Sequence, residues 1–294
     1  MRHLRRLSLV SICALAATIT GAAQSDWTPL WNGRNLDGWT TWMRQPEPTS
    51  DVPGLARGTD GKYTEPIGAG RDPLKVFTVA PDVDGKPAIH ISGEVFGELR
   101  TTRSFENYHL TLQFKWGQKK WPPRDRPDQP RDSGLLYHVH APPGRDGRTW
   151  ARSIELQIQE GDVGDLYAVG STIAVRARVR PGTTPALFDY DPAGEWMFFA
   201  QSHRQQGRCI KQPDNERPTG EWNTVELMTF GDEAIHVVNG KVVMRLRNPM
   251  RIDADVPAPV TSGPIILQSE GAEVFYRDIK IRPLKSIPAE FAAK

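Results

Sequence analysis

The sequence predicts an all-β protein, a two-sheet jelly-roll sandwich with a concave polar face. Short segments that alternate polar and apolar residues recur along the chain, as strands with one buried face do. Gly and Pro are numerous, 26 and 25 of 294 residues, and they separate these segments as turn residues. Past the N-terminal region we expect no amphipathic helix longer than a turn or two. Many short strands joined by such turns are typical of sandwiches and barrels.

Residues 1–23 are predicted to be an export signal. Three arginines precede an apolar run at 7–19, and small residues follow at 21–23. This order is typical of a signal peptide. The apolar run is shorter than the ~20 residues that span a bilayer, and no later segment approaches that length. We therefore expect an exported bacterial protein, periplasmic or secreted, without a membrane span.

The charge balance gives no reason to expect nucleic acid as a partner. The chain has 37 Lys and Arg against 35 Asp and Glu, and three arginines would leave with the signal. Near neutrality provides no attraction to nucleic acid or to an anionic membrane. Cys209 would be the one remaining cysteine, so no intrachain disulfide is expected. With no linker and no repeat, residues 24–294 are expected to form a single domain.

The elements follow in order. Four tryptophans between 27 and 42 predict an N-terminal strap that seals the sandwich edge, and 46–73 is expected to be a long loop. The segment 108–116 alternates strictly, and Asn239-Gly240 between β-branched residues is typical of a hairpin turn. The expected strands are 76–79, 88–91, 97–103, 108–116, 134–140, 152–159, 171–179, 195–199, 222–230, 234–238, 241–246, 264–269 and 274–282.

The strand 152–159 carries the most informative pattern. Successive side chains of a strand point to opposite sides. Its three apolar residues therefore face the interior, while Glu155, Gln157 and Gln159 face the other way. A solvated face more often carries Thr, Lys and Arg, so we interpret this row as the floor of a polar cleft. An ordinary solvated face is the alternative.

A histidine could stand beside this floor. If the strand 134–140 pairs with 152–159, His138 would lie next to Glu155 and Gln157, about 5 Å away across the ladder. A His beside a Glu supplies either a general base held by a carboxylate or two ligands of a divalent cation. A surface His bonded to a neighbour is the alternative, and the sequence does not decide whether a metal is bound.

Other residues resemble the floor in character. Gln268 and Glu270 share one face of their segment and have apolar residues behind them. Arg131 could supply the cation that a group of acids needs. Trp121 and Trp150 could stack on a sugar ring. For each of them alone, a structural role is the alternative.

The roles of two acids stay open, and several known catalytic motifs are absent. The sequence does not say whether Asp162 and Asp165 belong to the site or to a turn. It contains no Gly-x-Ser-x-Gly elbow, no phosphate-binding Gly loop and no paired-Cys metal site, which excludes the function classes that depend on them.

Six segments, in the family's own order, resemble the 3-keto-disaccharide hydrolase domain family. They are WNGRNLDGW at 31–39, RDSGLLYH at 131–138, SIELQIQ at 153–159, GEWNT at 220–224, VNG at 238–240 and VFYRDI at 274–279. The resemblance extends over residues 27–283. It implies a concanavalin-like β-sandwich in an exported bacterial protein that acts on 3-keto-glycosides.

This resemblance implies a reaction and roles. A ketone at C3 acidifies the C2–H, so a base can remove that proton and expel the C1 substituent, after which water adds. Glu155 or His138 would be the base, and Gln157 and Arg131 would orient substrate oxygens. Further substrate or acid contacts would come from Glu160, Gln268 and Glu270. A divalent cation held by His138 and carboxylates could polarise the ketone.

Two alternatives remain. The same face with Trp121 and Trp150 could bind a glycan without turnover. Glu155-x-Gln157-x-x-Glu160 also resembles the catalytic strand of laminarinase-type retaining glycosidases, in which the first Glu is the nucleophile and the last the acid/base, about 5 Å apart. Here Gln157 stands where that family has Asp. The test is whether Glu160 points toward Glu155.

Overall fold

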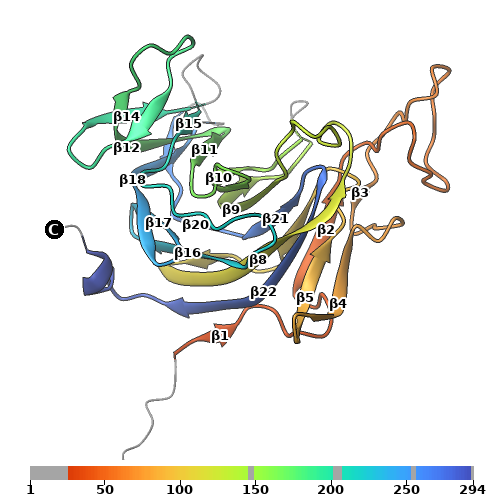
Figure 1. The fold of residues 1–294 in the computed structure, drawn as a ribbon, viewed down its shortest axis with the longest axis horizontal. Coiled ribbons are helices and arrows are strands. Elements are labelled where there is room, and N and C mark those ends of the chain that lie inside the picture. The colour runs from red at the N-terminus through yellow and green to blue at the C-terminus, as the bar shows by residue number, and fades with distance from the viewer. Residues whose placement is uncertain (1–25, 145–148, 201–206, 253–255, 293–294) are drawn as a thin grey trace, which may run out of the picture.

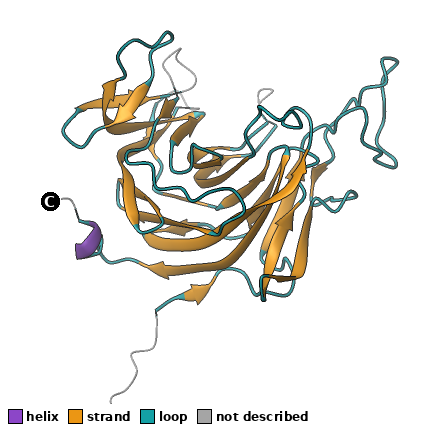
Figure 2. Cartoon of the chain, viewed as in Figure 1, coloured by secondary structure: helices purple, strands orange, loops and turns teal. Residues whose placement is uncertain are grey.

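Two antiparallel β-sheets lie face to face in the computed structural model, which describes residues 26–144, 149–200, 207–252 and 256–292 (Figures 1 and 2). Within these ranges the regular structure is almost entirely strand, and one 3-10 turn, η3 (Ala289–Phe291), lies near the C-terminus. The predicted all-β sandwich is therefore confirmed. The predicted signal at 1–23 lies outside the described residues.

Sheet A has twelve strands. Nine follow one another in space: β13 (Phe188–Tyr190), β12 (Ser171–Val179), β18 (Lys241–Arg251), β17 (Glu233–Val238), β16 (Asn223–Phe230), β8 (Tyr108–Lys120), β22 (Ala272–Pro283), β5 (Lys86–Ile91) and β4 (Phe77–Val83). Three more pair alongside: β1 (Thr28–Pro29) with β22, β14 (Glu195–Phe199) with β12, and β19 (Ala258–Pro259) with β18.

Sheet B has eight strands and carries the polar floor. Its order is β15 (Arg208–Cys209), β11 (Leu166–Val169), β10 (Arg152–Gln159), β9 (Asp132–Ala141), β21 (Ile266–Ser269), β6 (Gly97–Thr101), β2 (Trp39–Met43) and β3 (Gly68–Ala69). Two short strands, β7 (Phe105–Glu106) and β20 (Ser262–Gly263), pair separately. In Figure 1, β9, β10 and β21 lie above β8, β16 and β22 of sheet A.

The core lies between the sheets and follows the predicted alternation. From sheet B, Leu135, Leu156 and Leu267 are fully buried in it; from sheet A, Leu110 and Phe114 are. Ile154 and Ile158 also belong to this cluster. Removal of these apolar faces from water is the main driving force for the sandwich. The same alternation leaves the opposite face of sheet B for polar side chains.

The strand predictions were mostly right, but the N-terminal strap was not. Residues 39–43 form β2 inside sheet B, paired with β6, rather than a strap along the edge. Trp31 and Trp39 are buried in the main core. Several strands of two to four residues, including β11 and β15, were not predicted, because so few residues show no period. No helix in the described part of the chain is long and apolar enough to cross a membrane.

Candidate functional site

The face of sheet B turned away from sheet A, which we call the polar face, is built from two cross-strand rows. Paired residues in an antiparallel sheet point to the same side. One row runs through Arg208, Tyr167, Glu155, Leu136, Ile266, Arg100 and Thr40. The other runs through Gln157, Gly134, Gln268, Glu98 and Trp42. Glu155, Gln157 and Gln268 therefore share a face, as the sequence predicted.

Gly134 lets two of these side chains meet. A Cβ placed on Gly134 would lie 2.3 Å from Glu155 Oε1 and 2.3 Å from Gln268 Oε1. The two oxygens are thus separated by no more than twice that distance, and they occupy the space above the glycine. Glu155 is 5% exposed and Gln268 is fully buried. The carboxyl and the amide therefore converge at the centre of the polar face.

Three acids gather here around one arginine, and we call Asp132, Glu155 and Glu270 the acid cluster. Arg124 forms ion pairs with Asp132 and, at 3.3 Å, with Glu270. Burial and the charge of Glu270 raise the pKa of Glu155 well above its ordinary value. Burial also raises the pKa of Asp132 and of Glu270, against the lowering effect of Arg124. One ion-paired cation cannot keep three buried carboxylates ionised, so the cluster holds protons near neutral pH.

Several buried polar atoms on this face have no hydrogen-bond partner among the described residues. They are Glu98 Oε2, Asp132 Oδ1 and both side-chain polar atoms of Gln268. Buried polar atoms are nearly always bonded, because an unpaired one costs desolvation energy. A polar ligand on this face would supply the missing partners. The pattern is typical of a binding site rather than of a structural surface.

Two further groups border the cluster. Glu98 accepts a hydrogen bond from the backbone N–H of Ala151 at 2.7 Å, and burial raises its pKa to about 7. Tyr167 is the cross-strand partner of Glu155. Burial raises the pKa of Tyr167, so its phenol stays protonated and can donate to an oxygen on this face.

His138 does not stand beside Glu155. β9 and β10 pair as expected, but Leu136 is opposite Glu155 and Gly134 is opposite Gln157. At His138 the backbone has φ of 53°, and the register shifts there, so a bulge interrupts the alternation. His138 contacts the Tyr137 ring, and burial lowers its pKa to about 3. Such a histidine is neutral and a weak base, so the predicted His138–Glu155 pair is wrong.

Arg131 and Glu160 pair with each other instead of joining the acid cluster. Arg131 Nη1 lies 2.8 Å from Glu160 Oε1, and its backbone N–H donates to Oε2 at 2.8 Å. Thr219 adds a third bond to the same carboxylate, at 2.6 Å. The hydrogen bonds from Arg131 and Thr219 lower the pKa of Glu160, while burial opposes them. No interaction connects Glu160 to Glu155 among the described residues. The laminarinase-type pairing of Glu160 with Glu155 stays a prediction, and Arg124 is the cation that Arg131 was expected to be.

The two predicted sugar-stacking tryptophans flank the polar face in different ways. Trp121 donates from Nε1 to the backbone oxygen of Ser92 at 2.9 Å and lies three residues before Arg124. Trp150 stacks on Phe96, with ring centroids 5.9 Å apart, and packs on the small apolar patch of Leu136 and Ile266. Both side chains are half-buried.

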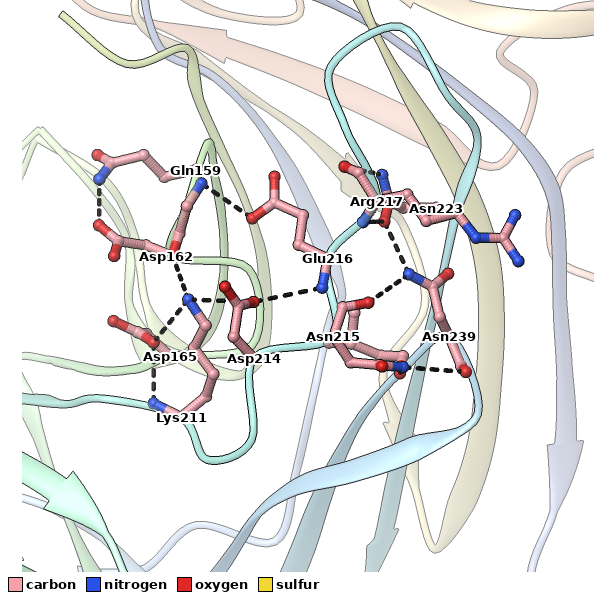
Figure 3. Close-up of polar contacts among 12 residues, drawn as sticks. Gln159, Asp162, Asp165, Lys211, Asp214, Asn215, Glu216, Arg217, Asn223 and Asn239 are labelled. Carbon is pink, nitrogen blue, oxygen red and sulfur yellow. Dashed lines mark hydrogen bonds and ion pairs between the residues drawn. The ribbon is translucent and has the colours of Figure 1, made fainter.

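Asp162 and Asp165 belong to the turn between β10 and β11. Asp162 accepts from Gln159 Nε2 at 2.6 Å, and Asp165 accepts from the Lys211 backbone at 2.9 Å (Figure 3). Arg208 pairs with both acids, at 2.7 and 2.6 Å. This network connects β10 to the segment after β15 and holds one end of the polar face in place.

The sequence suggested a divalent cation held by His138 and carboxylates, and the described residues form no such group of ligands. Among the residues that the structure describes, no three His, Cys, Asp or Glu side chains are arranged to hold a metal ion. His138 in particular has an Nδ1 with no partner in that part of the chain, and no carboxylate beside it.

Four residues of this face were missed from the sequence. Arg124 lies in an irregular Pro-rich loop without a period, and Tyr167 lies in the short β11. Asp132 and Glu98 could have been found. Asp132 lies two residues before Gly134, which is on this face, and Glu98 lies next to Leu99, which is buried on the other side of β6. Alternation carried two residues further along β9 and applied to β6 would have added them.

The comparisons agree with the resemblance. A family model described as a 3-keto-alpha-glucoside-1,2-lyase-like domain matches residues 26–282. No curated protein matches the chain. A candidate glycosyl hydrolase from Parabacteroides distasonis is similar in structure, with 17% identity, 88% of this chain and 94% of that chain covered, and a TM-score of 0.47. A carbohydrate-binding module from Bacillus subtilis has 8% identity, covers 70% and 91%, and gives a TM-score of 0.37.

Proposed function

The chain belongs to the 3-keto-alpha-glucoside-1,2-lyase-like domain family, and we propose that it cleaves 3-keto-glycosides by removing the C2 proton and expelling the C1 substituent. Family membership makes the chain a carbohydrate-active, hydrolase-like domain. The particular reaction is our proposal. With the export signal expected at residues 1–23, the reaction would take place in the periplasm or outside the cell.

The acid cluster is the observation that carries this proposal. Elimination next to a ketone needs a base at C2 and an acid at the leaving oxygen, within one small site. Buried carboxyls that share too few cations provide both, because one can hold a proton while its neighbour is ionised. Glu155 and Glu270 stand in this relation on the polar face. Glu270, beside Arg124, ionises more easily than Glu155, so the reactive form is the one in which their shared proton lies on Glu270. In that form Glu155 is ionised, and its raised pKa makes it a strong base.

In the first step Glu155 takes the C2 proton, and the electron pair moves into the C2–C3 bond with charge on the C3 oxygen. Two donors beside Glu155 stabilise that enolate oxygen: the Tyr167 hydroxyl and the Gln268 amide. When the charge returns, a C1–C2 double bond forms and the C1–O bond breaks. Protonated Glu270 gives its proton to the leaving oxygen. Water then adds across the double bond, which yields the free 3-keto sugar.

Glu155→Gln tests the assignment. The amide has nearly the same shape but cannot accept the proton, so we expect release of the leaving group from a 3-keto-glucoside to fall by about 1,000-fold. Unchanged release by the variant would remove Glu155 from its role. No release by the parent, together with binding of unoxidised oligosaccharides, would favour a glycan-binding module instead.

A further inference from the structure

A cavity of about 530 Å³ adjoins the polar face at β2, and flat apolar groups and polar groups contribute about equally to its walls. Trp42 and Tyr63 line it together with three prolines, Pro46, Pro48 and Pro66. A volume of this size is in the range of small-molecule sites. Apart from Trp42, Gly144 and Thr149, the walls come from the segment 44–66, most of which lies in the long loop expected at 46–73.

The cavity and the acid cluster form one continuous surface. Trp42 is the cross-strand partner of Glu98, and Glu98 is the partner of Gln268, so three neighbouring strands connect the cavity to the centre of the polar face. Arg44 also lines the cavity, and its charge lowers the pKa of Glu270. A group that leaves C1 beside Glu270 would therefore have the cavity next to it.

The loop that forms the cavity is fixed by its own contacts. Arg57 donates to the backbone oxygens of Pro48 and Ser50, each at 2.8 Å, and its guanidinium lies 3.9 Å from the centre of the Tyr63 ring. Val52 and Leu55 are buried in the main core. The cavity is therefore preformed, and binding requires little ordering of the loop.

Most of the polar groups in the walls already have partners in the protein, and Lys62 lies 3.8 Å from Asp60. Arg44 pairs with Glu47 at 3.0 Å. Gln45 donates to the backbone oxygen of Tyr63 at 3.3 Å. The Tyr63 hydroxyl donates to Ser50 O at 2.7 Å and accepts from Arg57 and from the Val52 N–H. A sugar unit would need these groups for its hydroxyls, whereas an aromatic ring needs flat apolar walls and few bonds.

We propose that this cavity receives the leaving group of the 3-keto-glycoside and that this group is a planar aromatic ring joined through a phenolic oxygen. Trp42 and the prolines stack on the ring. Arg44, close to Glu270, stabilises the negative charge that develops on the phenolic oxygen as the C1–O bond breaks. The inference rests on the proposed function for its substrate, but the cavity can be tested without turnover.

The kinetic test compares three 3-keto-glucosides that differ in the leaving group: 4-methylumbelliferyl, glucosyl and methyl. We expect the parent to show a kcat/KM for the aryl substrate at least about 10-fold above that for the other two, from ring burial. Trp42→Ala should lower the ratio of aryl to methyl kcat/KM about 10-fold, mainly through KM. Trp42→Phe keeps a flat ring and should therefore retain most of the aryl preference. Trp196→Ala, on the exposed surface of β14, is the matched control and should leave the ratio unchanged.

A binding test separates the two proposals. Free 4-methylumbelliferone should bind the parent in calorimetric titration, and Trp42→Ala should weaken that binding about 10-fold while Trp196→Ala does not. Turnover of all three substrates without an aryl preference, or a ratio that Trp42→Ala leaves alone, overturns the inference and leaves the proposed function standing. If no substrate is turned over but the phenol binds in a way that depends on Trp42, the proposed function is wrong and the assignment of the cavity stands.

Discussion

At the scale of single residues, the polar face depends on one absent side chain. Gly134 has no Cβ where the Glu155 and Gln268 oxygens converge, and its φ is not among the positive ones, so alanine fits its backbone. Any Cβ here must displace the flexible ends of both side chains rather than the backbone. The position thus separates the geometry of the site from the stability of the fold.

Gly134→Ala should therefore lower activity far more than stability. We expect the free energy of unfolding to change by about 1 kcal/mol at most, since side-chain ends yield easily. We expect kcat/KM on a 3-keto-glucoside to fall by about 100-fold, because a displacement of about 1 Å at a reacting group has that effect. Urea denaturation and steady-state kinetics measure the two quantities.

Gly117→Ala is the matched control. Its Cβ would lie 2.2 Å from Glu273 Oε2 and 2.4 Å from Glu273 Cγ, a clash at least as severe, with a carboxylate that is not in the acid cluster. Its kcat/KM should stay near that of the parent. Equal loss of activity in both variants would mean that Gly134 matters through folding alone.

Glu98 makes the stability of the protein depend on pH. Its pKa is about 7 when folded and near 4.5 when unfolded, so between these values the folded state binds more protons. The free energy of unfolding must then fall as pH rises across that window, by about 3 kcal/mol at most. Glu98→Gln keeps an acceptor for the Ala151 N–H and removes this dependence.

Urea midpoints at pH 5 and pH 8 check this expectation. The variant should gain stability relative to the parent at the higher pH, while other titrating groups such as Glu270 contribute equally to both. Parallel pH dependences in the two proteins would show that Glu98 is not buried as described.

At the scale of elements, the bulge on β9 decides which residue can be the base. Because the register shifts at His138, the histidine leaves the row that strict alternation would give it, and Val139 joins Leu136 in the patch beside Trp150. A bulge cannot be seen in a single sequence, since the residues on both sides still alternate.

His138→Asn should retain activity within about 3-fold, because general acid–base groups contribute about 100-fold or more when removed. Asparagine tolerates the positive φ, so the bulge can persist. Kinetics on a 3-keto-glucoside, with circular dichroism as the folding control, measure the effect. A folded variant that has lost about 100-fold in rate would return the role of base to His138.

At the scale of the whole molecule, the sandwich was predictable because its core obeys a period. The strand 152–159 was placed with its ends correct, and the apolar residues of 108–116 are buried as alternation requires. The pairing of β9 with β10 was expected, but the partner on the other side of β10 was not predictable, because β11 is a four-residue strand that carries no pattern of its own.

The site was predictable in part for the same reason. Glu155, Gln157 and Gln268 share a face because all three lie on period-2 strands. Arg124 comes from an irregular loop, and its pairing with Asp132 and Glu270 depends on where that loop returns to the sheet. The Arg131–Glu160 pair likewise reflects the meeting of two strand ends, which local sequence does not encode.

The central claim is that Glu155 removes the C2 proton of a 3-keto-glycoside. The most direct measurement follows the fate of that hydrogen by mass spectrometry, with a C2-deuterated 3-keto-glucoside as substrate and an enzyme-free reaction as reference. The account predicts that the parent releases the leaving group with loss of the C2 deuterium to solvent, and that Glu155→Gln does neither above the reference rate. Release of the leaving group with the C2 deuterium retained in the sugar product would contradict it.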